Sequence, residues 1–398
     1  MNRERHFPES FTQTTLKQDS SIARPKEFSR LSSLEETLKR KYEDLINMLP
    51  PEPHPDAFTR IGTPESRTRD QHHQDAQTVR FGLEKKETPE LAFGDLLEAF
   101  MQVELSRQNW FGARFVRVSK FDDYDNGIDG VLEWPSDHPE TSFRLALDFT
   151  VAANDDVLKK KLGKLQRGNR VRYFQSSVKD ARGRTYETSL SNLPMVILGV
   201  DRATLRKILE ETNTDREKLA EHPIRALLVE QAAIQTGLQV RELCARLVGN
   251  TIGRDEKISE RIRTAVQMYR EGIKSDREFT KKIDVVADLF SGIPKEELTQ
   301  AFQDKDQADR LFQILHVYKK IEEARTQIKD ELTSATQWVG DSRTHRRLAA
   351  GSPALSFSSS LFIRQFFCFF FSQNSLQSFL FRNSCRLFKG FYRCLNFC

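Results

Sequence analysis

The strongest constraint on the fold is an aspartate inside an apolar segment. Residues 143–151 read FRLALDFTV, and Asp148 interrupts the apolar run that begins at Leu145. Such a run is typical of a central β-strand that is covered on both faces of its sheet. A carboxylate in that position is costly unless it is paired, hydrogen-bonded or bound to a metal ion. The sequence therefore predicts a central strand whose aspartate has a partner in the interior.

Two further strand-like segments precede this one, at residues 115–118 and 128–134. A proline-bounded turn separates the second of them from the apolar segment, so 128–134 and 143–151 are expected to form a hairpin. Asp129 lies on the first strand of this hairpin and Asp148 on the other. Paired strands place side chains of matching parity on one face of the sheet, so the two carboxylates can converge.

Helical patterns surround the strands and complete a predicted α/β domain at residues 88–212. Its first helix begins at Thr88 and Pro89 and carries an apolar stripe. A helix, two strands and another helix follow at residues 154–166, 171–174 and 195–200 and from residue 201. The order α-β-β-β-α-β-β-α predicts a mixed sheet flanked by helices. The acidic segment DDYDNG (122–127) is interpreted as a turn, because the helices that flank a calcium-binding loop are missing.

The two ends of the chain have compositions unlike that of the α/β domain. Residues 1–87 are mostly polar and are expected to be largely disordered, apart from one helix at 33–49 that starts with a capping box. The tail 341–398 is a low-complexity segment rich in Phe and Ser. We interpret it as out-of-frame or read-through translation, because a folded protein does not expose so much Phe without a partner.

Residues 213–340 have helical patterns almost throughout. Breaks are expected at Gly237, Gly253 and Gly292. The last helix, 305–333, carries apolar residues at a period close to 3.5. This stripe predicts either an antiparallel helix pair within the chain or the seam of a homodimer.

Charge and cysteine content do little to identify a partner. The net charge is +5, but the chain after Asp341 holds basic residues and no acidic ones, so overall basicity gives no argument for nucleic acid. Cys244 is the one cysteine before the tail, which fits a reducing cytoplasm and offers no zinc site. No secretory signal is evident, and polar residues interrupt the apolar part of the tail. We therefore expect a cytoplasmic protein without a membrane span.

The pattern of elements and acids resembles the PD-(D/E)XK superfamily of metal-dependent nucleases. The resemblance covers about residues 88–200 and implies a restriction-endonuclease-like fold. It implies that Asp129 and Asp148 match the two motif acids and that Glu98 matches the acid of the first helix. The backbone carbonyl of Phe149 would then complete a site for Mg²⁺ or Mn²⁺.

The sequence departs from that family at the motif lysine, where Thr150 stands. Some members supply the cation from the following helix, and this chain has several lysines there. Lys161 shares a helical face with Leu158 and Leu165, so it is the candidate that points toward the carboxylates. A lysine there would stabilise the charge that develops during phosphodiester cleavage. The same position would also let Lys161 border the stripe and extend to solvent.

A basic segment beside the predicted site favours a nucleic-acid partner, with DNA expected and RNA as an option. Residues 159–184 contain ten basic residues and one acidic residue, with Tyr173 and Phe174 among them. The predicted phosphate-binding residues are Lys159, Lys160, Lys164, Arg167, Arg170 and Arg172. A solvated loop around Gly183 is the alternative interpretation.

Three classes of function remain open from the sequence. The first is a Mg²⁺-dependent deoxyribonuclease with Asp129, Asp148 and Lys161 as catalytic residues. The second is a nuclease-like module that binds nucleic acid or protein without catalysis, which Thr150 favours. The third is a scaffold protein in which the long helices carry the function. Walker, Rossmann-glycine, serine-nucleophile and zinc motifs are not found, so nucleotide hydrolysis, dehydrogenase and zinc-hydrolase functions have no support.

Overall fold

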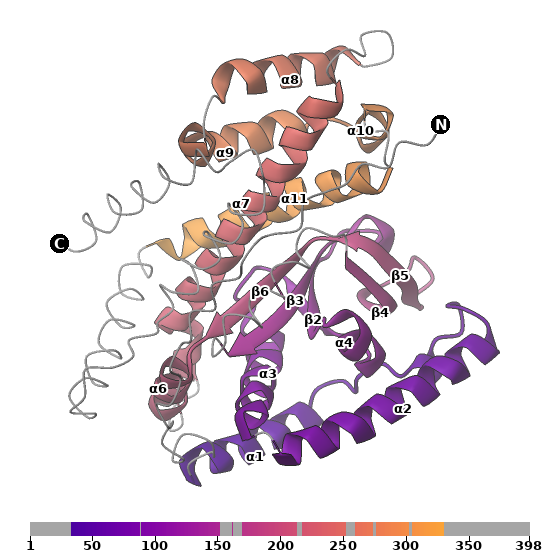
Figure 1. The fold of residues 1–398 in the computed structure, drawn as a ribbon, viewed down its shortest axis with the longest axis vertical. Helices are drawn as coiled ribbons and strands as arrows, with labels where there is room; N and C mark the ends of the chain where they lie inside the picture. The colour runs from indigo at the N-terminus through magenta and orange to yellow at the C-terminus, as the bar shows by residue number, and fades with distance from the viewer. Residues whose placement is uncertain are drawn as a thin grey trace, which may run out of the picture.

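A four-stranded mixed sheet lies at the centre of the fold (Figure 1). The computed structural model describes residues 33–87, 89–151, 161, 169–212, 217–251, 259–273, 276–301 and 305–329. In spatial order the strands are β1 (Arg114–Arg117), β2 (Gly130–Trp134), β3 (Phe143–Val151) and β6 (Met195–Val200). The first three are antiparallel neighbours, and β6 is parallel to β3. The predicted hairpin and the central position of its second strand are confirmed.

The strand register places the two aspartates opposite each other. Gly130 pairs with Leu147, and Asp129, the residue before β2, donates its backbone N–H to the carbonyl oxygen of Leu147 at 2.8 Å, which brings it beside Asp148 of β3. A Cβ atom at Gly130 would lie 2.2 Å from a ring carbon of Phe115, so only glycine allows β1 to pack this closely beside Asp129. The register therefore gives the acidic pair a common face of the sheet.

A second, two-stranded sheet follows the central strand in the sequence. It consists of β4 (Asn169–Lys179) and β5 (Thr185–Leu193), which are antiparallel. The predicted strand 171–174 is thus part of a longer hairpin that is separate from the main sheet, and β5 was not expected. Most of β5 is only partly buried and its sequence, TYETSLSNL, is polar, so it lacks the apolar pattern that predicts a strand. The predicted helix 154–166 lies outside the described residues, apart from Lys161, which is helical.

Helices enclose the larger hydrophobic core, which contains Leu145 and Leu147 of β3. Long helix α7 runs from α6 at one end to α8 at the other, and α11 lies across it (Figure 1). Helix α3 (Pro89–Gln108) precedes the strands. The helices that follow them are α6 (Arg202–Thr212), α7 (Pro223–Thr251), α8 (Glu260–Gly272), α9 (Asp276–Ser291), α10 (Lys295–Ala301) and α11 (Lys305–Gln327). Short 3₁₀ helices occur at Pro55–Ala57, Pro139–Thr141 and Glu217–Glu221.

The break expected at Gly237 is wrong, because this residue lies in the middle of α7. A Cβ atom there would lie 2.6 Å from the Cδ1 atom of Ile283 on α9, so the glycine lets the two helices approach closely. The break expected at Gly292 is confirmed between α9 and α10. Gly253 lies outside the described residues.

The N-terminal region contains more structure than its composition suggested. The predicted helix is present as α1 (Ser33–Asn47), and a second helix, α2 (Pro64–Glu87), corrects the expectation of one helix in residues 1–87. Figure 1 shows α1 and α2 along one edge of the molecule, with α4 (Lys120–Asn126) between α2 and the strands. Buried Asp70, Gln71 and Gln74 make the inner face of α2 polar, which is why it lacks an apolar stripe.

Three glutamines of α7 close the open edge of β6. Gln235 accepts the backbone N–H of Ile197 and donates to its carbonyl oxygen, both at 2.8 Å. Gln231 forms the same pair of bonds with Gly199, and Gln239 donates to the carbonyl oxygen of Met195. The glutamines recur every four residues and therefore share one helical face. They satisfy backbone groups that an edge strand otherwise leaves unpaired.

The apolar stripe of the last helix is buried within the chain. Leu311, Ile314 and Ile321 of α11 are fully buried in the larger core, which also contains Leu228 and Leu243 of α7. The stripe is therefore packed within the chain, against α7. These side chains are not available for a homodimer seam. Among the described residues, no helix combines the length and apolar content needed to cross a membrane.

Candidate metal centre

Short helix α4 brings an unexpected aspartate to the start of β2. Ser119 caps α4 by accepting the backbone N–H of Asp122, and Gly127 ends it in a left-handed conformation with a φ of 60°. The chain then turns directly into Asp129 and β2. The segment predicted to be a turn therefore forms most of a short helix, and it presents Asp123 beside Asp129.

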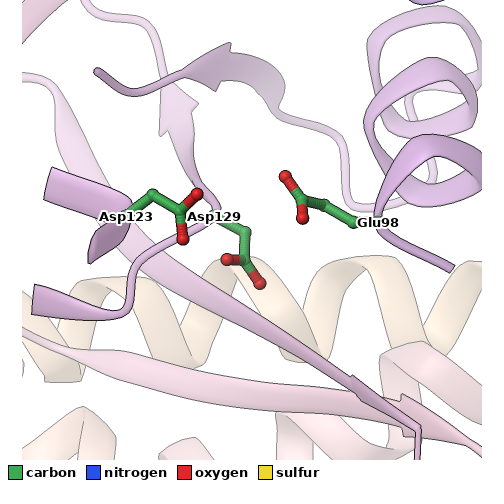
Figure 2. A group of neighbouring side chains, drawn as sticks. All are labelled: Glu98, Asp123 and Asp129. Atoms are coloured by element: carbon green, nitrogen blue, oxygen red, sulfur yellow. The ribbon is translucent and has the colours of Figure 1, made fainter. Parts of the chain in front are cut away.

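Three carboxylates converge at this point. Oxygen atoms of Glu98, Asp123 and Asp129 all lie within 4.8 Å of one another. Figure 2 shows the side chains approaching from three places: α3, α4 and the residue before β2. Carboxylate oxygens are the ligands that Mg²⁺ and Mn²⁺ prefer. Two oxygens bound to one Mg²⁺ at about 2.1 Å are at most about 4.2 Å apart, so only a small closure of this cluster is required.

Asp148 lies next to this cluster and is bonded to Lys161. Lys161 donates from Nζ to Oδ1 of Asp148, and to the backbone carbonyl oxygen of Phe149 at 3.0 Å. The backbone N–H of Phe149 in turn donates to Oδ2 of Asp129. One short stretch of β3 thus connects Asp148, Lys161 and Asp129. The structure places Lys161 against the carboxylate and the carbonyl, although its side chain remains partly exposed.

The like charges of the cluster change the proton affinities of its members. Burial raises the pKa of Asp129 well above its usual range, and the neighbouring charges of Glu98 and Asp148 raise it further. Burial also raises the pKa of Glu98, against the opposing effect of Lys120. Carboxylates with raised pKa values that share a site are a feature of functional centres.

On the same face of the sheet, another buried carboxylate is neutralised by an ion pair. Arg144 of β3 donates to Glu133 of β2 at 2.8 Å and 3.0 Å, and Ser176 and Ser177 of β4 complete the partners of this carboxylate. The opposite charges neutralise each other and the serines fasten β4 to the sheet. By contrast, Asp129 lies beside a second acid, Asp148, which is bonded to Lys161. The neighbouring acids Glu98 and Asp148 raise the pKa of Asp129 despite this lysine, so the cluster carries an excess of negative charge when ionised.

Lys120, the first residue of α4, also contacts the cluster. Its Nζ atom is 3.0 Å from Asp123, 3.4 Å from Glu98 and 3.7 Å from Glu52. Burial alone would lower the pKa of Lys120, but the three carboxylates outweigh this effect and raise it well above the usual lysine value. Lys120 therefore carries a positive charge at neutral pH.

Asp122 fixes the position of α4 against the second sheet. Its carboxylate accepts the backbone N–H groups of Arg172, at 2.6 Å, and Tyr173, at 3.0 Å. These amides lie at a shift in the β4–β5 register, where the strand ladder is interrupted. Asp122 thus replaces the missing ladder bonds and holds the neighbouring Asp123 in place.

The structure brings together some of the predicted site residues and separates others. Glu98 and Asp129 converge with Asp123 in the carboxylate cluster, whereas Asp148 and the Phe149 carbonyl contact Lys161. Asp123 and Lys120 were not predicted as site residues. The local signal that could have found them is the Ser119 cap followed by acids and Asn126-Gly127, which is typical of a short helix.

Of the predicted phosphate-binding residues, two lie in the described part of the chain. Arg170 is exposed at the start of β4. Arg172 is already engaged: its guanidinium is 2.9 Å from Asp70 of α2 and lies over the rings of Phe121 and Tyr173. Its first role is therefore to fasten α2 to β4. Lys159, Lys160, Lys164 and Arg167 lie outside the described residues.

Comparison with protein families, with characterised proteins and with solved structures finds no match for this chain.

Proposed function

We propose that this chain is a Mg²⁺- or Mn²⁺-dependent hydrolase that cleaves phosphodiester bonds in DNA. The observation that carries the proposal is the convergence of Glu98, Asp123 and Asp129 beside an Asp148–Lys161 pair on one face of the sheet. A cluster of acids with a lysine at its border provides metal ligands and a cation for transition-state charge. The order of strands β1-β2-β3-β6, with β6 parallel to β3, also supports a restriction-endonuclease-like fold.

Each group at the site has a chemical role in this proposal. Glu98, Asp123 and Asp129 supply the oxygen ligands, and Asp148 with the Phe149 carbonyl forms the adjoining wall. A bound divalent cation would polarise the phosphate and lower the pKa of a coordinated water. Lys161 would move with the reaction from Asp148 toward the phosphate oxygens and stabilise the charge that develops there.

The position of Lys161 explains how a threonine can stand at the motif lysine. Thr150 lies on the same face of β3 as Asp148, because alternate residues of a strand share a face. The threonine side chain is short and uncharged, so it cannot supply a positive charge to the carboxylates. The ammonium of Lys161, ten residues after the end of β3, reaches Asp148 and the Phe149 carbonyl instead.

Exposed basic residues of the β4–β5 hairpin support DNA as the substrate. Arg170, Lys179 and Arg182 are exposed, and the base of this hairpin is held by Asp122, one residue from the carboxylate cluster. Cations at such positions bind the phosphate backbone without regard to sequence. They would hold DNA while the cluster acts on one phosphodiester bond.

DNA cleavage by the full chain tests this function. Supercoiled plasmid should be nicked with Mg²⁺ or Mn²⁺ and remain intact with EDTA. Asp148→Asn should reduce the rate by about 100-fold or more, because the carboxylate beside the metal ligands is lost. Asp137→Asn removes the same charge at the exposed far end of the β2–β3 hairpin, so it should have no effect.

The proposed role of Lys161 is tested by removing this lysine and by introducing one at position 150. Lys161→Met should slow cleavage by about 100-fold, since one charge-stabilising group is removed. In the double variant Lys161→Met/Thr150→Lys, part of the rate should return, because the ammonium enters the same sheet face from β3. Binding of DNA without metal-dependent cleavage by the wild type would instead support a non-catalytic binding module. Absence of DNA and RNA binding would leave the helical scaffold.

A further inference from the structure

The ammonium of Lys120 is placed where a bound cation would be expected. It contacts Asp123 at 3.0 Å and Glu98 at 3.4 Å, two of the three carboxylates that converge in Figure 2. These acids belong to different helices, so Lys120 connects α3 and α4 electrostatically. A compact ammonium on a flexible stem is able to do this without a fixed geometry.

The charges around Lys120 do not cancel. Glu98, Asp123 and Asp129 contribute three negative charges when ionised, and Lys120 contributes one positive charge. Two negative charges remain, which is the charge of one divalent cation. Glu52 does not change this sum, because Arg117 donates to the same Glu52 oxygen that Lys120 approaches.

We propose that Lys120 is the resident counter-ion of the metal-free site and that a divalent cation displaces its ammonium from Glu98 and Asp123 toward Glu52. Lys120 is then a positioning residue: it keeps the carboxylates together before the metal binds and sets the affinity for the metal. This inference rests on the proposed function, because it concerns the same carboxylate cluster.

The surroundings of Lys120 allow this movement. Glu52 lies 3.7 Å from Nζ and is not part of the three-carboxylate cluster, so it offers the ammonium a second position nearby. Lys120 begins α4 and its side chain is partly exposed, so its stem can rotate without disturbing the helix. Arg117 is also bonded to the carbonyl oxygen of Pro50, which keeps Glu52 and its segment in place.

Titration of the full chain with Mn²⁺ tests the role of Lys120. Lys120→Met keeps most of the side-chain length but removes the charge that competes with the metal. It should bind Mn²⁺ about tenfold more tightly than the wild type, because a nearby cation opposes metal binding at partly buried sites. Lys120→Arg should stay within a few-fold of the wild type. Lys319→Met removes a similar cation, 2.7 Å from Asp288 and outside the cluster, and should not change the affinity.

Thermal unfolding gives a second measurement on the same variants. In EDTA, Lys120→Met should melt below the wild type, because three carboxylates lose their counter-ion, and Mn²⁺ should remove this difference. If Lys120→Met binds Mn²⁺ no more tightly than the wild type, the counter-ion role is wrong while the metal site stands. If neither protein binds Mn²⁺, both the counter-ion role and the proposed function are wrong.

Discussion

At the scale of single residues, Asp129 is an acid that the fold places among other acids. It lies near Asp148 and Glu98, and its pKa is raised by burial and by both of these neighbours. Its carboxylate accepts a hydrogen bond from the backbone N–H of Phe149. A residue that costs stability in the absence of a ligand is typical of a binding or catalytic site.

The pH dependence of stability follows from this raised pKa. Between the ordinary aspartate pKa of about 4 and the raised value, folded Asp129 binds a proton that the unfolded chain does not bind. The metal-free wild type should therefore lose stability as the pH rises through this window. In EDTA at neutral pH, Asp129→Asn should be more stable than the wild type by about 0.5–2 kcal/mol, and the difference should shrink toward pH 5.

Urea unfolding at several pH values measures this difference, with Asp137→Asn as the exposed control. Addition of Mg²⁺ should stabilise the wild type and leave Asp129→Asn unchanged, since the variant lacks a ligand. A variant that is less stable than the wild type at neutral pH would show that Asp129 is a structural residue.

The sequence alone was sufficient to place the residues whose positions depend on regular strand or helix geometry. Asp129 and Asp148 could be placed on one face because strand parity is fixed, and Lys161 because helical spacing is fixed. Asp123 and Lys120 could not be placed. Their positions depend on whether six residues form a turn or a helix, and that choice is made by contacts of α4 with α2 and β4.

At the scale of elements, polar side chains replace apolar packing at two places. Helix α2 is fastened by Asp70 to Tyr173 and by Gln74 to the backbone of Phe121. Helix α7 is fastened to β6 through Gln231, Gln235 and Gln239. Methods that search for apolar stripes miss such faces, which is why α2 was not predicted and the pairing of α7 with β6 was not foreseen.

The glutamine contacts of α7 make a specific stability prediction. Gln235→Leu has similar volume but leaves the N–H and carbonyl of Ile197 buried without their partner. It should lower the free energy of unfolding by about 2–5 kcal/mol, since each unsatisfied buried group costs roughly 1–3 kcal/mol. Gln267→Leu on the exposed face of α8 is the control and should stay within about 0.5 kcal/mol. Equal denaturation midpoints for both variants would contradict a role for Gln235 in closing the edge of β6.

At the scale of the whole molecule, the helical region completes the core of the sheet. Buried residues of α7 and α11 belong to the same hydrophobic cluster as Leu145 and Leu147 of β3. The boundary predicted at residue 213 therefore separates two parts of the chain in sequence but not in packing. Because α2 also holds α4 in position, tests of the site need the full chain.

The central claim is that the carboxylates of Glu98, Asp123 and Asp129 hold a divalent cation. Anomalous diffraction at the manganese edge, from crystals of the full chain grown with Mn²⁺, measures this directly. We predict a peak bonded to Asp129 and to at least one of the other two acids at about 2.1–2.2 Å, with the Lys120 ammonium moved toward Glu52. Saturating Mn²⁺ without a peak at these carboxylates, and Lys120 still in contact with Glu98 and Asp123, would contradict the claim.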